Sequence, residues 1–169
     1  MQTIDPKAVT NYERTQEELE QFWIFCILVA GKNADWAARC VTRLLSRKLD
    51  GQTPLEFLEA EGNALHNTLV ANRVGQYNRI SKAIEGSYGI DLRTCTVEEL
   101  EAIHGIGPKT ARFFILHTRL NADVAVLDTH VLKWMRDRMG VENVPGTSKC
   151  VHSSVDVVTM RAGDIRLIG

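Results

Sequence analysis

Most of this chain repeats one pattern, in which a helix-capping residue is followed by apolar residues three and four positions apart. Thr15, with Glu18 three positions later, precedes apolar residues that extend to Ala30. This combination is a capping box followed by the spacing of an amphipathic helix. A second helix is predicted after Asn33, and its inner face consists of Trp36, Ala37, Cys40, Val41, Leu44 and Leu45. The chain therefore begins with two helices separated by Gly31.

The helical pattern continues towards residue 118. Proline fits the first turn of a helix, so Thr53-Pro54 predicts a short helix there. Further helices are predicted over residues 63–72, 76–87 and 97–104, the last with Thr96 as N-cap. No alternating run of β-formers is present, apart from a weak apolar segment at residues 124–127. The predicted fold class is all-α.

Composition places the chain among ordinary globular domains. It has 169 residues, 44% hydrophobic and 24% charged, and a single domain usually has about 100–200 residues. No window approaches the ~18 consecutive apolar residues of a membrane span, and the N-terminus lacks the order of a signal peptide. We expect an intracellular monomer with no membrane partner.

The four cysteines, Cys26, Cys40, Cys95 and Cys150, are far apart in the sequence. Zinc sites usually contain closely spaced cysteine pairs, and Fe–S clusters also need closely spaced thiolates. We therefore expect reduced, mostly buried thiols and no metal or Fe–S cluster.

Charge is unevenly distributed along the chain. Twenty Lys and Arg against 21 Asp and Glu give a formal net charge of −1 at pH 7. Residues 1–30 carry two basic and five acidic side chains, residues 31–48 carry five and one, and residues 105–140 carry six and three. Two basic segments are thus present within a neutral total. They are either solvated helix faces or surfaces that attract nucleic acid.

Two glycines lie between two predicted helices at residues 100–111. The run Leu100-Glu101-Ala102-Ile103-His104-Gly105-Ile106-Gly107-Pro108-Lys109-Thr110-Ala111 indicates a helix, a turn and a second helix that begins at Pro108. Glycine allows positive φ and a close approach of the backbone. The amides of Gly105, Gly107 and the helix start, which includes Thr110, can then point at one phosphate oxygen. The run predicts sequence-independent binding of a nucleic-acid backbone, whereas glycines that only end a helix are the alternative.

An acidic residue at a predicted helix start follows at Leu127-Asp128-Thr129-His130. One interpretation of Asp128 is an N-cap of that helix. The other pairs its carboxylate with the amine of Lys109, because the two residues begin successive helices that must pack together. His130 is assigned to packing or hydrogen bonding.

Together these motifs resemble the superfamily of helix–hairpin–helix DNA glycosylases, which includes endonuclease III and the 8-oxoguanine glycosylases. The resemblance extends from about residue 29 to residue 141. It depends on Arg73-Val74-Gly75-Gln76-Tyr77-Asn78, on the glycine turn, on Leu127-Asp128-Thr129-His130 and on the spacing of Lys109 and Asp128. A typical member has proline at the position of His104, a difference that alters only the beginning of the turn.

The resemblance implies a helical barrel over residues 31–127, with the helix–hairpin–helix at about 97–118. A second small helical lobe is expected from residues 1–30 and 128–169, although residues 147–169 match no motif and their place in the lobe is left open. Tyr77 is expected to be structural. Trp23, Trp36 and Trp134 fall on apolar helix faces and are predicted to pack in the core.

Members with a lysine at the position of Lys109 act as both glycosylase and AP lyase. The resemblance therefore implies that the Lys109 amine attacks C1′ of a damaged nucleoside, expels the base and forms a Schiff base that permits β-elimination. Because an ammonium cannot attack, we expect partial burial and the positive end of the helix to favour the neutral amine. Ionised Asp128 would stabilise the positive charge that develops on the sugar.

The implied partner is double-stranded DNA whose damaged base is flipped out of the stack. Lys32 or Asn33, between the first two helices, is the candidate wedge for the resulting gap, with a plain helix cap as the alternative for Asn33. No cofactor is expected. A monovalent cation on the backbone carbonyls of residues 103–107 is the one ion that the resemblance allows.

The main functional hypothesis is a bifunctional DNA glycosylase/AP lyase that removes an oxidised base in base excision repair. The alternative is a non-catalytic helix–hairpin–helix module whose DNA binding survives the loss of both Lys109 and Asp128. A third option is a glycosylase remnant that its unusual tail has inactivated.

Overall fold

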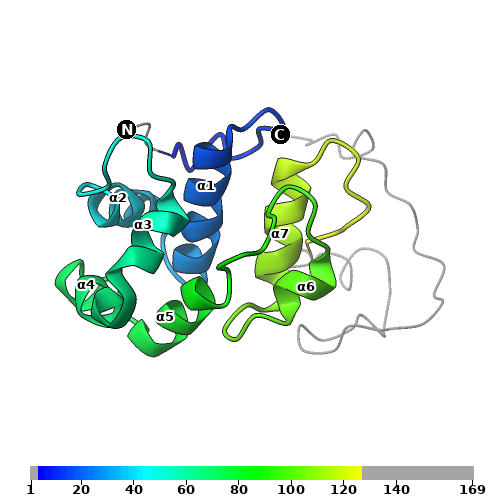
Figure 1. Cartoon of the computed structure of the whole chain (residues 1–169). Coiled ribbons are helices and arrows are strands. Elements are labelled where there is room, and N and C mark those ends of the chain that lie inside the picture. Colours follow the sequence, from blue (N-terminus) through cyan, green and yellow to red (C-terminus); the bar gives the residue numbers. More distant parts are fainter. Residues whose placement is uncertain (1–3, 127–169) are drawn as a thin grey trace. The chain divides into compact units, whose positions relative to one another are not determined.

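The computed structural model describes residues 4–126, and every regular element in this part of the chain is a helix (Figure 1). The helices are α1 (Gln16–Val29), α2 (Ala34–Leu44), α3 (Pro54–Glu61), the 3-10 helix η1 (Gly62–Ala64), α4 (Leu65–Ala71), α5 (Tyr77–Glu85), α6 (Val97–Glu101) and α7 (Pro108–Thr118). Residues 124–126 form no strand. The predicted all-α class is confirmed.

The predicted helix starts are confirmed by their caps. The Thr15 hydroxyl accepts from the Glu18 amide at 3.3 Å, and the Glu18 carboxylate accepts from the Thr15 amide at 2.8 Å. Asn33 Oδ1 accepts from the Trp36 amide at 3.0 Å, and Thr53 and Thr96 form capping boxes of the same kind. Helix ends are less well predicted, since α6 ends at Glu101 and not at residue 104.

Helix α1 is the central element of the fold. Every residue from Leu19 to Leu28 is buried, and α1 contacts α2, α3, α5 and α7. The prediction that this helix is amphipathic is therefore wrong for its second half. Phe25 and Leu28 fall outside the expected stripe and are buried by other helices. A helix that is apolar on all sides is typical of a core element.

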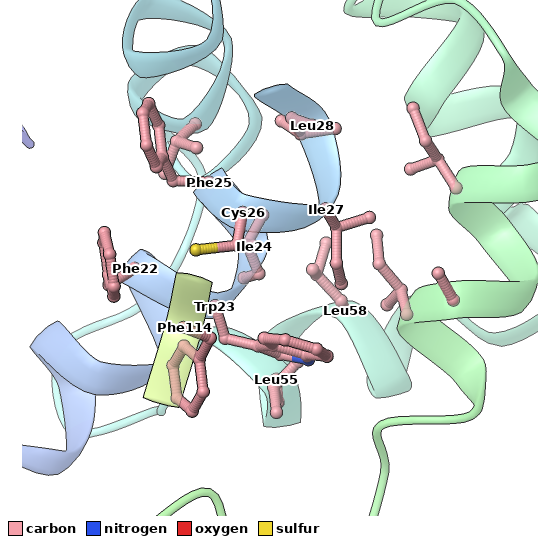
Figure 2. Packing of buried hydrophobic residues seen from close by; sticks show 14 of the residues in the cluster. Phe22, Trp23, Ile24, Phe25, Cys26, Ile27, Leu28, Leu55, Leu58 and Phe114 are labelled. Carbon is pink, nitrogen blue, oxygen red and sulfur yellow. The ribbon is translucent and has the colours of Figure 1, made fainter. Parts of the chain in front are cut away.

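Aromatic packing fixes α7 against α1 (Figure 2). The rings of Trp23 and Phe114 meet edge to face with centroids 4.9 Å apart, and Phe22 lies 5.9 Å from Phe114. Trp23 Nε1 donates to the Ser87 hydroxyl at 2.7 Å, and this hydroxyl donates to the Ala83 carbonyl at 2.6 Å. The predicted core position of Trp23 is confirmed, and the helix that carries Lys109 is anchored in the core.

The described residues 4–126 belong to one compact unit that contains all of these helices. The predicted lobe of residues 1–30 and 128–169 stays a prediction, because residues 127–169 lie outside the described part. Asp128, His130, Trp134 and Cys150 lie there too. The predicted burial of the thiols is confirmed for Cys26, Cys40 and Cys95, which are free and buried. None of the described helices has the length and hydropathy of a membrane span.

Candidate functional site

The run at residues 100–111 folds as predicted into two helices joined by a tight turn. At the end of helix α6, the Ala102 amide donates to the Glu98 carbonyl at 2.9 Å. In the turn, the Ile106 amide donates to the Ile103 carbonyl at 3.0 Å, and both isoleucine side chains are buried. These contacts fix the path of the turn, and Gly107 is exposed.

The two glycines of the turn differ in what they require. Gly105 has φ +87°, and a Cβ there would lie 2.7 Å from Arg79 Cγ and 3.0 Å from the Arg79 carbonyl oxygen. Gly107 has φ −100°, and its Cβ would meet no atom within 4 Å. Positive φ and close approach are thus confirmed for Gly105 only. Nothing in the described residues requires glycine at Gly107, so the open space there is available to an approaching ligand.

The start of α7 presents backbone donors. Gly107 is its N-cap and Pro108 occupies the first turn, without a side-chain cap. Within residues 4–126, no backbone carbonyl accepts from the amide of Gly107 or Thr110. Such amides, together with the positive end of the helix dipole, bind phosphate groups. The geometry therefore suits the predicted phosphate contact.

Lys109 is the second residue of α7, and its side chain is exposed. The helix buries Ala111, Phe114 and Ile115 on its inner side, and Lys109 lies on the opposite side because two residues correspond to a rotation of about 200°. The expected partial burial is therefore not observed. Exposure leaves the amine accessible to a large substrate such as DNA.

One arginine that the sequence reasoning missed holds the turn in place. Arg79 Nη1 donates to the Gly105 carbonyl at 3.0 Å, Nη2 donates to the Ile27 carbonyl at 2.8 Å, and Nε donates to Gln76 Oε1 at 2.7 Å. Burial lowers the pKa of Arg79. In the sequence, Arg79 could have been noticed by its position on α5. It lies beside Ile80 and four residues before Ala83, which are both buried, so a cation falls on the inner side of this helix.

Lys32 joins two loops. Its ammonium donates to the Val74 carbonyl and lies 4.4 Å from the centroid of the Trp36 ring. A Cβ at Gly75, where φ is +64°, would lie 2.9 Å from Lys32 Nζ. Burial lowers the pKa of Lys32. Trp36, which was predicted in the core, is partly buried against it.

These two cations connect three loops. Lys32 joins the α1–α2 loop (residues 30–33) to the α4–α5 loop (residues 72–76), and Arg79 joins the α4–α5 loop to the hairpin turn (residues 102–107). The α4–α5 loop itself contains positive φ at the non-glycine residues Arg73 and Gln76. Backbone strain of this kind concentrates at functional sites. The segments of Lys32 and Gly105, predicted separately to bind DNA, are thus linked through one strained loop.

Part of the first basic segment has a structural role. Arg43 donates to the Asn72 carbonyl at 2.6 Å, and Lys48 pairs with Glu17 at 3.1 Å. Arg39 and Arg47 are exposed. The segment is therefore neither a simple solvated face nor wholly available for DNA.

The role of Lys32 in DNA binding stays a prediction that salt dependence tests. Each phosphate that a cation neutralises makes the slope of log K against log salt concentration about 0.9 more negative. Because Val74 and Trp36 already bind its ammonium, Lys32→Gln is expected to leave this slope unchanged in duplex binding. Arg39→Gln, which removes an exposed cation of the same segment, is expected to make the slope about 0.9 less negative, a decrease in its magnitude. An equal decrease in Lys32→Gln would show that Lys32 contacts phosphate.

No group of three or more His, Cys, Asp or Glu residues able to hold a metal occurs among residues 4–126. Several carbonyls of the expected monovalent-cation site already accept hydrogen bonds. The Gly105 carbonyl accepts from Arg79, the Ile103 carbonyl from Ile106, and the Gly107 carbonyl from the Ala111 amide at 3.1 Å. A cation at this turn stays a prediction.

The all-helical unit and its glycine turn define a protein of the helix–hairpin–helix class. The chain matches the family model for 8-oxoguanine DNA glycosylase (Ogg-HhH) over residues 5–152, and it therefore belongs to this family. No curated protein and no solved structure gives a significant match. Family membership confirms the predicted superfamily and makes the chain a DNA glycosylase of base excision repair with DNA as its substrate.

Proposed function

We propose that the protein is a bifunctional glycosylase and AP lyase that removes 8-oxoguanine from double-stranded DNA. The observation that carries this proposal is the exposed Lys109, one turn or less from the backbone amides of Gly107 and Thr110, which donate to no backbone carbonyl within residues 4–126. This arrangement can bind a phosphate and present an amine to the adjacent sugar. The description of the matched family, 8-oxoguanine DNA glycosylase, supports 8-oxoguanine as the proposed base.

In the proposed reaction, the neutral Lys109 amine attacks C1′ of the flipped nucleoside. The new N–C1′ bond forms while the glycosidic C1′–N9 bond breaks, and the base leaves with that electron pair and takes up a proton. The C1′–O4′ bond then breaks, O4′ takes up one of the two protons on the nitrogen, and a protonated Schiff base remains on Lys109. Loss of a proton from C2′ expels the 3′ phosphate, and hydrolysis of the Schiff base releases the enzyme.

Asp128 is proposed to serve this reaction with its ionised carboxylate. It would stabilise the positive charge on the sugar as the glycosidic bond breaks, and it would accept the proton of Lys109. This role is taken from the family resemblance alone, since Asp128 lies outside the described residues. Asp128→Asn is the variant that addresses it.

The hairpin is proposed to hold the DNA backbone beside the lesion. Amide contacts to phosphate position a protein on the duplex and carry no sequence information. They suit an enzyme whose target is a damaged base in any sequence context. Flipping this base costs a few kcal/mol, and contacts on both sides of the lesion offset that cost.

The alternative function is a non-catalytic module that binds duplex DNA. The exposure of Lys109 is compatible with it, because an exposed ammonium can contact phosphate directly. The two functions differ in whether Lys109 acts as a nucleophile, because DNA binding by the module would survive the loss of Lys109.

Strand cleavage separates these possibilities. A duplex with one 8-oxoguanine opposite cytosine is incubated with the protein, and strand breaks are measured with and without alkali. The bifunctional enzyme is expected to cut the lesion strand without alkali and to leave an undamaged duplex intact. Breaks only after alkali would indicate a glycosylase without lyase activity, and no breaks in either sample would contradict the enzymatic proposal.

A further inference from the structure

We infer that Arg79 is a positioning residue that holds the hairpin turn in the conformation that binds phosphate. The inference rests on the proposed function of the hairpin. Arg79 lies in α5, far from the turn in sequence, and no motif of the chain assigns it a role. Its three hydrogen bonds end on three different segments, namely the hairpin turn, the last turn of α1 and the start of α5.

Arg79 fits closely against Gly105. Arg79 Nη1 donates to the Gly105 carbonyl at 3.0 Å. On the same side, the aliphatic part of Arg79 occupies the space that a Cβ of Gly105 would fill. Arg79 therefore both binds the turn and packs against its backbone.

Arg79 also binds two acceptors outside the turn, the Ile27 carbonyl and the Gln76 side chain. Ile27 is in the last turn of α1, where helix carbonyls have no partner within the helix. Gln76 begins α5 with φ +46° and makes no cap with its side chain. Arg79 satisfies both groups, so it stabilises one strained residue and one helix end together with the turn. Strained backbone persists only where surrounding contacts determine it.

The planar shape of the Arg79 side chain distinguishes it from lysine. A guanidinium carries five donors in one rigid plane, whereas an ammonium is a point charge on a flexible chain. Lysine at this position keeps the charge but cannot hold all three acceptors at once. Arg79→Lys therefore separates the geometry of the side chain from its charge.

Arg79 affects DNA binding through the turn that it holds. With the Gly105 carbonyl held inward, the turn continues to exposed Gly107 and to the amides at the start of α7. Without this bond, the turn can sample other conformations, and the amides at Gly107 and at the start of α7 no longer keep one orientation. Binding then requires the turn to be ordered first, which lowers the affinity without changing the number of phosphate contacts.

The test compares Arg79→Gln and Arg79→Lys with Lys82→Gln, which removes an exposed cation from the same helix. Affinity for an 8-oxoguanine duplex is measured over a range of salt concentrations. Both Arg79 variants are expected to bind about tenfold more weakly with an unchanged salt slope, and Lys82→Gln is expected to bind as the wild type does. Full binding by Arg79→Lys, or a salt slope that becomes about 0.9 less negative in Arg79→Gln and stays at the wild-type value in Arg79→Lys, would overturn the inference, because charge alone would then suffice.

Amide hydrogen exchange in the free protein provides the second readout. Both Arg79 variants are expected to exchange at least about tenfold faster at residues 103–107, with no change in α3. Unchanged exchange at the turn would contradict the inference even if DNA binding were weaker. This readout needs no DNA, so it still tests Arg79 if the wild-type protein binds no duplex, in which case the proposed function itself fails. If Arg79→Gln does not fold, exchange in Arg79→Lys decides.

Discussion

The Lys109→Gln variant is expected to form no covalent adduct with lesion DNA under borohydride and to lose lyase activity by at least about 10³-fold, the scale on which catalysis falls when a nucleophile is removed. Glutamine has no amine, so no Schiff base can form. The side chain lies on the exposed face of α7, opposite Phe114. The substitution should therefore leave the fold intact, which a thermal unfolding curve checks.

Lys109→Arg is the matched variant that separates nucleophile from charge. Arginine keeps the positive charge, but its guanidinium stays protonated and cannot attack C1′. We expect duplex binding close to that of the wild type and no strand cleavage. If Lys109→Arg and Lys109→Gln both retained cleavage, Lys109 would not be the nucleophile.

The second large effect is a contrast between Gly105→Ala and Gly107→Ala. Gly105→Ala is expected to lower the free energy of unfolding by at least about 2 kcal/mol, because left-handed backbone costs a non-glycine residue roughly 1–2 kcal/mol. The clash of the new methyl with Arg79, whose carbonyl oxygen would be 3.0 Å away, adds to this cost. Urea unfolding of both variants measures the difference.

Gly107→Ala is expected to change the free energy of unfolding by less than about 1 kcal/mol, the usual cost of alanine at an N-cap. Its φ of −100° suits any residue, and its methyl would enter open space. In the DNA complex, the same methyl occupies the path of the phosphate, so affinity should fall at least about tenfold. Wild-type affinity in Gly107→Ala would show that the phosphate does not approach this glycine.

Local chemistry explains which parts of the fold could be predicted from the sequence. Thr15, Asn33, Thr53 and Thr96 start helices because a side-chain oxygen near the helix start accepts from the backbone. Gly105 was recognisable because a tight turn between two helices often needs positive φ. These features depend on a few neighbouring residues, and a sequence displays them directly.

Long-range contacts explain what was missed. The burial of α1 on all sides depends on four other helices, and an apolar stripe does not show how many partners a helix has. Arg79 is 26 residues from Gly105 and 52 from Ile27, so its role depends on how α5 packs. The bond between Lys32 and the carbonyl of Val74, 42 residues away, likewise depends on how two loops meet, and the role of Lys32 in DNA binding stays a prediction. The burial of α1 and the contacts of Arg79 and Lys32 are all determined by tertiary packing.

The candidate site was accordingly predicted in part. The hairpin, its glycines and the position of Lys109 at a helix start follow from the run at residues 100–111. The exposure of Lys109 was not foreseen, because the side of α7 that faces the core depends on Phe114 and its aromatic partners in α1. The pairing of Lys109 with Asp128 stays a prediction.

Borohydride trapping of the wild-type protein on a duplex that contains 8-oxoguanine tests the central claim most directly. Reduction converts the Schiff base into a stable amine, so protein and DNA remain linked in a denaturing gel. The bifunctional mechanism predicts a linked species whose DNA-bearing tryptic peptide contains Lys109, and no such species on an undamaged duplex. The absence of adduct on both 8-oxoguanine and abasic duplexes, or a link to another lysine, would contradict it.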